Sequence, residues 1–361
     1  MDARFDLAIV GAGMAGASLA AALAPAGASV LLLEAESAPG YHATGRSAAF
    51  WTESYGGPGV QPLTTASGPA LRNGGYLTPR GALTIARAGQ EAELAAFIAR
   101  FERLGVRVDA LDRAAMEPLV PGLKPEWTTA ALEPDCCDID VARLHQDCLA
   151  AARRAGAGLW THARLAAADP APSGWTLTMA DGRTASARTL VNAAGAWADD
   201  VARLAGVRPV GIRAFRRTVA QLRTAPAVPA SLPLVLDLSE RFYFKPQAGR
   251  LWLSPHDETP SAACDAAPEE LDVAAAIDRL AGVTDWQVER VEHRWAGLRS
   301  FAPDRLPVFG FAPGRPSFFW FAGQGGFGIQ TAPAAAALAA ALFGTGTAPV
   351  DPAPYAPGRF A

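Results

Sequence analysis

Residues 5–23, FDLAIVGAGMAGASLAAAL, carry the strongest structural signal in this chain of 361 residues. The mostly apolar run 5–10 predicts a strand, and the Ala- and Leu-rich run 17–23 favours a helix packed closely against a sheet. Between them lies a G-x-G-x-x-G motif made by Gly11, Gly13 and Gly16. Such glycines permit a tight turn, close approach of the backbone to a pyrophosphate and close helix–strand contact. The stretch therefore predicts a dinucleotide-binding unit.

The segments that follow indicate which dinucleotide is bound. A second apolar run, Ser29–Leu33, ends at Glu34, 18 residues after Gly16 (34 − 16 = 18). An acidic side chain there accepts hydrogen bonds from a ribose diol and repels a 2′-phosphate. Residues 37–49 are rich in Gly, Ser, Thr and Ala and do not form the next parallel strand of an NAD-binding domain. Because a loop of small residues can lie along a planar ring system, the sequence favours FAD.

Composition and charge exclude several classes of function. Lys and Arg number 32 and Asp and Glu 35, so the net charge is −3, and charged residues make up 19% of the chain. This low charge argues against long disordered tails and against a nucleic-acid partner. The N-terminal residues do not resemble a signal peptide, and no apolar run is long enough to span a bilayer. A cytoplasmic location is expected, with peripheral membrane association left open.

The four cysteines, Cys136, Cys137, Cys148 and Cys264, show neither C-x-x-C spacing nor a disulfide framework. We expect them to be reduced and mostly structural. No histidine lies at ligand spacing from the adjacent pair Cys136 and Cys137. No metal site is expected.

Six segments together make the chain resemble the D-amino acid oxidase (DAO) superfamily of FAD-dependent enzymes, and within it the bacterial D-arginine and D-amino acid dehydrogenases. They occur in the family's order over nearly the whole chain: Val10–Ser18, Pro39–Ala49, Val191–Trp197, Phe242–Pro246, Trp295–Phe301 and Gln324–Thr331. The resemblance implies an α/β fold with a glutathione-reductase-type Rossmann FAD-binding domain. It also implies a substrate domain with a mixed, largely antiparallel sheet.

The implied domains are discontinuous. The FAD-binding domain is expected in residues 1–74, 142–211 and 294–361, and the substrate-binding domain in residues 75–141 and 212–293. Strand-like runs fit this division, at 190–194 and 318–322 in the first domain and at 76–86, 218–222, 234–238 and 242–244 in the second. Residues 331–342 predict a closing helix, and the Pro- and Ala-rich stretches 168–173 and 224–233 are interpreted as surface turns.

The resemblance also implies the chemistry. A hydride passes from the substrate Cα to flavin N5, and the imino acid formed is hydrolysed to a 2-oxo acid and ammonia. Arg299 matches the family's bidentate carboxylate clamp, and Arg217 matches a second arginine near it, with Arg216 expected on the opposite face of a strand. Tyr243 and Tyr55 match tyrosines that reach the carboxylate or close the pocket mouth. Gly326 matches the position whose carbonyl accepts from the substrate amine.

The FAD is expected to be non-covalent, because no cysteine follows Cys264 at the position where some relatives attach the flavin. The residues expected to contact it are Gly11, Gly13, Met14, Ala15, Gly16, Glu34, Ala35, Thr44, Gly45, Arg46, Ser47, Ala48, Ala49, Leu165, Ala194, Gly195, Trp197, Gly297, Arg299, Gly325, Gly326, Gly328, Ile329 and Gln330. Lys245, in the Phe-Tyr-x-Lys-Pro motif, is interpreted as structural, and so are His42 and His145.

Two departures from the arginine-specific pattern concern the substrate side chain. The glutamate that pairs with a substrate guanidinium is replaced by Ala82, and a pocket histidine by Phe50. An unpaired buried cation costs about 3–5 kcal/mol, so D-arginine is expected to be a poor substrate and an uncharged apolar or aromatic side chain a better one. Thr52, Leu234 and Leu236 are the other expected pocket residues. Glu53 is the residue that could supply a displaced acid.

Three alternatives stay open from the sequence. The enzyme could oxidise an N-methyl or cyclic secondary amino acid such as sarcosine or proline, or a 2-hydroxy acid. It could also be a non-catalytic FAD-binding subunit, although the intact set of Arg299, Tyr243 and Gly326 argues against that. The D configuration follows from the resemblance alone. The electron acceptor (a quinone, another carrier or O2) and the oligomeric state are not encoded in any motif found here.

Overall fold

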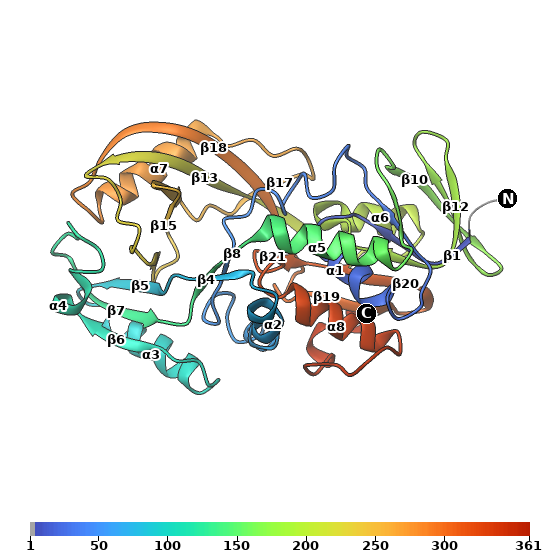
Figure 1. Ribbon diagram of the computed structural model, residues 1–361, viewed down its shortest axis with the longest axis horizontal. Helices are drawn as coiled ribbons and strands as arrows, with labels where there is room; N and C mark the ends of the chain where they lie inside the picture. Colours follow the sequence, from blue (N-terminus) through green and yellow to red (C-terminus); the bar gives the residue numbers. More distant parts are fainter. Residues whose placement is uncertain (1–3) are drawn as a thin grey trace.

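The computed structural model describes residues 4–361 and contains two large β-sheets and a small one (Figure 1). The first large sheet has the order β10-β11-β12-β1-β2-β9, with β20 beside β12 and β19 beyond it. Its strands are β1 (Arg4–Val10), β2 (Val30–Leu33), β9 (Gly158–Trp160), β10 (Leu165–Ala171), β11 (Gly174–Met179), β12 (Thr184–Asn192), β19 (Val308–Ala312) and β20 (Arg315–Ala322). β20, β12, β1, β2 and β9 run parallel. Three remote stretches of chain thus build one sheet.

Helices cover one face of this sheet. α1 (Met14–Leu23) lies between α5 (Val141–Arg154) and α8 (Ala332–Leu342), and α2 (Gln61–Asn73) packs against α8. Small Ala side chains on α1 and α8 are buried together with strand residues such as Ile9 and Phe319. This close packing follows from the Ala-rich sequences, because an alanine surface lets a helix approach its neighbours.

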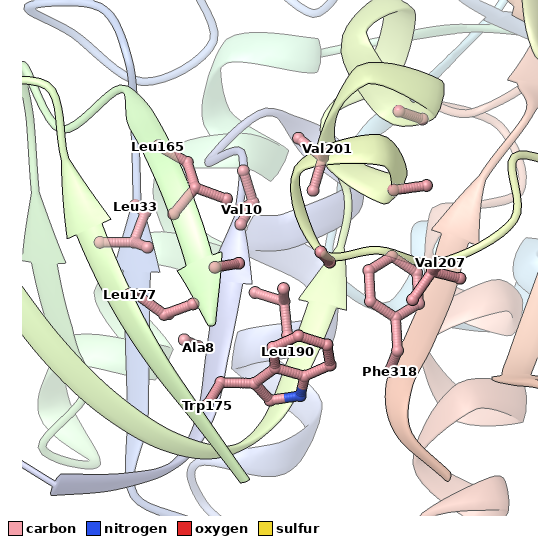
Figure 2. Close-up of a cluster of buried hydrophobic side chains, with 14 of the residues drawn as sticks. Ala8, Val10, Leu33, Leu165, Trp175, Leu177, Leu190, Val201, Val207 and Phe318 are labelled. Atoms are coloured by element: carbon pink, nitrogen blue, oxygen red, sulfur yellow. The ribbon is translucent and has the colours of Figure 1, made fainter. Parts of the chain in front are cut away.

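On the opposite face, side chains of β10 and β11, which continue the sheet beyond β12, pack against the parallel strands together with α6 (Ala198–Leu204), which follows the short 3-10 turn Gly195–Trp197. Figure 2 shows the cluster there, in which Trp175 lies against Leu190 and the ring of Phe318 lies near Val207. The Trp175 indole donates a hydrogen bond to the Ser317 carbonyl at 2.7 Å. With both faces covered, the parallel strands are apolar at residues 7–10, 30–33 and 318–322, as expected for a buried parallel sheet.

The second large sheet has the order β21-β18-β13-β16-β15-β14-β5-β7-β6, with β17 beside β13. Its strands are β5 (Ala82–Arg87), β6 (Asp109–Asp112), β7 (Trp127–Glu133), β13 (Arg213–Ala225), β14 (Leu234–Asp237), β15 (Tyr243–Gln247), β16 (Arg250–Ser254), β17 (Thr259–Ser261), β18 (Gln287–Phe301) and β21 (Gln324–Gly325). All pairs are antiparallel except β14 with β5. The predicted combination of a Rossmann-type sheet and a largely antiparallel sheet is confirmed.

Three helices accompany the second sheet: α3 (Glu91–Glu102), α4 (Arg113–Met116) and α7 (Glu270–Ala281). The small third sheet is formed by β3 (Phe50–Trp51), β8 (Cys137–Ile139) and β4 (Leu77–Pro79). The long strands β13 and β18 run side by side from the middle of the molecule toward one end (Figure 1). The predicted domain boundary at 293/294 falls within β18, and the division into two domains stays a prediction.

Three expected elements differ from the structure. Residues 224–233 are not a surface turn throughout, since β13 extends to Ala225 and the side chains of Val228 and Leu232 are buried. Residues 76–86 are not one strand, because the chain turns at Gly81, whose φ of 73° suits glycine, and separates β4 from β5. Residues 168–173 are not a surface turn throughout, since β10 extends to Ala171 and Pro170 pairs with Trp175. A proline fits there because β10 lies at the edge of its sheet, where a missing N–H leaves no ladder bond unmade.

Among residues 4–361, no helix has both the length and the apolar character needed to cross a bilayer.

Candidate active site

The glycine turn forms one end of the site. Gly11 follows β1 with φ of 99°, and a Cβ there would lie 2.5 Å from the Ala193 carbonyl oxygen. The helix α1 starts directly after Gly13, and the Met14 N–H is bound by the Thr44 hydroxyl at 2.9 Å. The turn is thus fixed against the ends of two neighbouring parallel strands. A helix N-terminus in this position attracts a phosphate group.

Glu34 and His145 hold the turn from either side. The Glu34 carboxylate accepts from the Ala12 N–H at 3.1 Å and from the Glu36 N–H at 3.0 Å. The His145 Nε2–H donates to the Ala12 carbonyl at 2.8 Å. Burial lowers the pKa of His145 and so favours the neutral ring, while this hydrogen bond acts in the opposite direction. His145 is therefore a structural tie between α5 and the turn, as interpreted from the sequence.

One elongated cavity of about 440 Å³ extends from this turn to the second sheet. Most residues expected to contact the cofactor line it: Gly11, Gly13, Met14, Ala15, Glu34, Ala35, Thr44, Arg46, Ser47, Ala48, Leu165, Ala194, Gly195, Trp197, Gly297, Arg299, Gly325, Gly326, Gly328 and Ile329. Ala49 and Gln330 line a small adjoining cavity, whereas Gly16 and Gly45 line neither. The contact of each of these residues with a cofactor stays a prediction.

Gly11→Ala is expected to lower the affinity for FAD by at least about tenfold, because an added Cβ meets Ala193 and L-residues avoid this φ. The measurement is the visible flavin absorbance per protein after dialysis against defined FAD concentrations. Gly27→Ala is the matched control, since Gly27 has the same φ of 99° but open space around its Cβ position. Equal loss of flavin in both variants would contradict the expected role of the turn.

Two arginines and two tyrosines meet at the other end of the cavity. Arg299 on β18 and Arg217 on β13 lie on neighbouring strands, where Arg217 pairs with Gly297 and Arg299 pairs with Phe215. Arg299 Nη1 donates to the Tyr55 hydroxyl at 2.7 Å. Gly326 lies directly against this guanidinium, and a Cβ there would come within 2.5 Å of Arg299 Cζ. The structure thus brings together Arg299, Arg217, Tyr55, Tyr243 and Gly326.

Arg217 is 4% exposed, and only some of the hydrogen-bond donors of its guanidinium have partners. Its Nε donates to the Asp257 carbonyl at 2.7 Å and its Nη2 to Glu258 at 3.3 Å, but its Nη1 has no hydrogen-bond partner among residues 4–361. Burial and the charge of Arg299 lower the pKa of Arg217. A buried donor without a partner beside a second guanidinium suits an incoming anion, and a carboxylate is the group that arginines bind best in pairs.

Arg216 confirms the expected alternation along the strand. It points away from Arg217 and forms ion pairs with Glu269 and with Asp272, the latter at 2.9 Å.

An apolar wall of buried side chains lies next to the arginines. Its members Ala48, Phe50 and Tyr243 line the cavities, whereas Ala82, Leu234 and Leu236 line neither. Phe50, Ala82, Leu234, Tyr243, Cys136 and Ala48 form one buried cluster, with Leu236 packed against it. Four of the five expected pocket residues are therefore neighbours. Thr52 is the exception, because it lies outside this cluster, is fully buried and donates its hydroxyl to Glu133 at 2.5 Å.

Glu133 is a residue that the sequence analysis missed. It is 2% exposed and accepts four hydrogen bonds, from the Thr52 and Ser54 hydroxyls and from the Glu53 and Ser54 N–H groups. Burial raises its pKa, although these hydrogen bonds act in the opposite direction. Glu133 stands opposite Ala82 across β5 and β7. Its carboxylate is therefore used to hold the segment that carries Tyr55.

Glu53, the candidate for a displaced acid, does not reach the pocket. Its carboxylate accepts a hydrogen bond from the Thr65 hydroxyl on α2. Lys245 is likewise used internally, since its ammonium is 2.6 Å from Asp138 and its side chain is 3% exposed. This geometry agrees with the structural interpretation of Lys245.

His256 is a second missed residue. It lies in the loop after β16, and its Nε2 is 3.2 Å from the Tyr55 hydroxyl. Gln330 was expected to contact the cofactor. In the structure its side-chain amide Nε2 donates to the Tyr55 carbonyl at 3.2 Å and to the Thr64 hydroxyl at 2.9 Å. No local sequence pattern predicts these three contacts, because the two partners lie 201 residues apart for His256 and Tyr55, 275 for Gln330 and Tyr55, and 266 for Gln330 and Thr64.

Comparison with known proteins identifies a family and individual relatives. The family profile DAO, described as FAD dependent oxidoreductase, matches residues 6–342. Glycine oxidase of Pseudomonas putida is 29% identical over 279 residues, covering 74% of this chain and 71% of that protein. Hydrogen cyanide synthase subunit HcnC of Pseudomonas aeruginosa is 26% identical over 181 residues, which cover 48% of this chain and only 40% of HcnC.

Solved structures share the fold. Glycine oxidase from Geobacillus kaustophilus has a TM-score of 0.85 at 24% identity, with 98% of each chain covered. L-proline dehydrogenase from P. horikoshii has a TM-score of 0.87 at 19% identity, covering 100% of this chain and 98% of that chain. L-α-glycerophosphate oxidase from Mycoplasma pneumoniae, solved with FAD bound, has a TM-score of 0.86 at 16% identity, with 95% of each chain covered.

Proposed function

The chain belongs to the DAO family of FAD-dependent oxidoreductases, and we propose that within this family it oxidises the amine of D-amino acids with an uncharged apolar or aromatic side chain. The observation that carries the proposal is the pairing of a buried two-arginine site with an adjoining apolar wall. The arginines supply a place for the carboxylate, and the wall supplies a place for the side chain. The D configuration rests on the resemblance of the motifs to D-amino acid dehydrogenases.

FAD is the cofactor of this family, and the residues present fit it. Gly11, packed against Ala193 in the tight turn, and Gly13, beside Thr44, both line the cavity at the start of α1, and Glu34 lies buried where a ribose diol would be bound. When bound, FAD accepts the hydride that leaves the substrate Cα. We expect it to be held without a covalent bond, so that denaturation releases it. The 2-oxo acid and ammonia then form by hydrolysis of the imino acid.

The polar residues orient the substrate in this proposal. The free Arg217 Nη1 and the Arg299 guanidinium bind the carboxylate, and Tyr55 and Tyr243 enclose it. The Gly326 carbonyl accepts from the amine. Two adjacent cations disfavour an ammonium group nearby, so the amine is bound neutral after losing its proton to solvent. The chain's residues thus hold three groups of the substrate, which fixes the direction of its Cα–H bond.

The side-chain preference is the part that can be tested most directly. D-Leu, D-Phe and D-Met are expected to exceed D-Arg and D-Lys in kcat/KM by about two to three decades, since no free carboxylate faces the apolar wall in the described residues. The measurement is anaerobic bleaching of the visible flavin band, followed by admission of air to distinguish O2 from another electron acceptor. Faster bleaching by D-Arg or D-Lys would refute the preference.

A matched variant checks the same point from the opposite direction. Ala82→Glu places a carboxylate within the apolar cluster and is expected to raise kcat/KM for D-Arg while lowering it for D-Leu. Ala82 is itself only 2% exposed, so the control asks what a new carboxylate does outside the cluster. Thr78→Glu, on the exposed side of β4, is suitable and should leave the ratio of the two substrates unchanged.

Oxidation of glycine or an N-substituted glycine is the second candidate function. The observation that favours it is the 29% identity to glycine oxidase over 74% of the chain. The same two arginines would bind the carboxylate of such a substrate. Glycine, sarcosine, proline and lactate therefore belong in the bleaching panel. Preference for glycine or sarcosine over D-Leu would replace the first proposal, and turnover of lactate without ammonia would indicate a 2-hydroxy acid.

A further inference from the structure

The loop after β16 contacts both arginines of the substrate site. Asp257 and Glu258 bind Arg217 directly, whereas His256 reaches Arg299 through Tyr55. The loop itself is well held. The His256 N–H donates to the Ser254 hydroxyl at 3.2 Å, Arg279 donates to the Pro255 carbonyl, and Asp257 accepts from the Thr218 N–H at 2.8 Å.

The protons in this chain of contacts can be assigned from the chemistry of the partners. His256 Nδ1 is 2.6 Å from the Glu240 carbonyl, which can only accept, so Nδ1 carries the proton. In the neutral ring Nε2 is then a bare acceptor. The Tyr55 oxygen accepts from Arg299 Nη1, because a guanidinium can only donate. The single Tyr55 proton is therefore directed to His256 Nε2, 3.2 Å away.

The surroundings keep His256 neutral. Burial, together with the charges of Arg217, Arg299 and Arg305, lowers the pKa of His256 to about 2, against a smaller opposing effect of the Glu240 carbonyl. The rings of Tyr55 and Tyr243 face the imidazole at 6.1 and 5.8 Å. The neighbouring acids Asp257 and Glu258 are both bound to Arg217, and Glu258 also to Arg305. The imidazole thus acts as an acceptor over the whole physiological pH range.

We propose that His256 is a positioning residue that accepts the Tyr55 hydroxyl proton and thereby holds Tyr55 against Arg299 in the geometry that binds the substrate carboxylate. The proposal rests on the proposed function, since it assigns His256 a place in the same carboxylate site. Without an acceptor at Nε2, the Tyr55 hydroxyl would be free to rotate its proton toward Arg299, where it repels the guanidinium. His256 therefore supports carboxylate binding without touching the substrate.

A double-mutant cycle distinguishes this role from general structural support. His256→Leu is expected to weaken binding of anthranilate, an aromatic carboxylate used as the probe, by about tenfold, as loss of one hydrogen bond does. In the Tyr55→Phe background the same substitution should change binding less than about twofold, because there is no hydroxyl to hold. His256→Gln, which keeps an acceptor, should recover most of the loss. The matched control His293→Phe, at an exposed site on β18, should change nothing.

The outcomes separate this inference from the proposed function. Equal losses in both backgrounds, or no loss with His256→Leu, would overturn the positioning role even if the wild type oxidises amino acids. Failure of the wild type to oxidise any amino acid would overturn the proposed function, while the anthranilate cycle would still decide the role of His256. A wild type that binds no anthranilate and no amino acid would overturn both, because there would be no carboxylate site to position.

A measurement on the ligand-free enzyme covers the case in which the leucine variant does not fold. Nitrogen-15 NMR of the histidine side chains should show one ring, absent in His256→Gln, as the neutral Nδ1–H form at pH 5. Its Nε2 signal should shift on Tyr55→Phe. A protonated His256 ring at pH 5, or an Nε2 chemical shift that is the same with and without Tyr55→Phe, would overturn the inference.

Discussion

Replacing Arg299 with methionine is expected to lower kcat/KM for the best amino acid substrate by about two to four decades, with the loss residing mainly in substrate binding. Arg299 lies between Tyr55 and Gly326 at the end of the cavity, and a methionine of similar length cannot bind a carboxylate. The carboxylate would then enter a buried site with one guanidinium fewer. Steady-state kinetics on the variant with full flavin content measure the effect.

Two further variants define what that loss means. Arg299→Lys keeps the charge but not the fork, and we expect it to recover only part of the activity, because a single ammonium cannot bind both carboxylate oxygens in parallel. Arg294→Met removes an exposed arginine five residues earlier on β18 and should leave kinetics unchanged. Similar kcat/KM values for the Arg299→Met and Arg294→Met variants would remove Arg299 from the carboxylate site.

Asp138→Asn is expected to lower the free energy of unfolding by about 3–5 kcal/mol, the largest effect on stability that we predict. Asp138 lies on β8, 2.6 Å from the Lys245 ammonium and 2.8 Å from the Arg80 guanidinium. Lys245 is 3% exposed, and burial already lowers its pKa. Removing the carboxylate would leave that ammonium buried without a counter-charge. Urea unfolding followed by fluorescence of the tryptophans gives the measurement.

The double variant Asp138→Asn with Lys245→Met is the informative comparison. It removes the buried charge together with its partner and should regain at least half of the lost stability. Asp109→Asn, at an exposed ion pair with Arg107, should change stability by less than about 1 kcal/mol. If Asp138→Asn proved no more harmful than Asp109→Asn, this buried pair would contribute nothing to the fold.

The parts of the site that the sequence predicted are those encoded by local patterns. The glycine turn and Glu34 follow from strand, turn and helix signals within 30 residues, and most expected cofactor contacts line the cavity. Alternation along a strand was enough to place Arg216 and Arg217 on opposite faces. The substitutions at Ala82 and Phe50 were found only because the surrounding motifs resemble a known family.

The missed residues depend on contacts that no short pattern records. Glu133 binds residues 52–54, about 80 positions earlier in the chain, and His256 binds Tyr55 across 201 positions. Both are single polar residues in otherwise unremarkable stretches, and only the folded arrangement gives them partners. The contact of Thr52 with Glu133 likewise could not be inferred from the sequence around Thr52. Such residues hold the site residues in position, and comparison of short motifs does not identify them.

The walls of the long cavity have a consequence for how the enzyme matures. They come from residues 10–48, 163–165, 193–204, 217–219, 243, 264–266, 297–300 and 324–329, so the first and the last of them are separated by most of the chain. During synthesis the glycine turn emerges early, but its far wall is complete only after residue 329 has left the ribosome. The complete flavin site can therefore form only after nearly all of residues 10–329 have been synthesised. Once bound, the flavin joins early and late segments, so a truncated product would be unable to retain it and would be open to proteolysis.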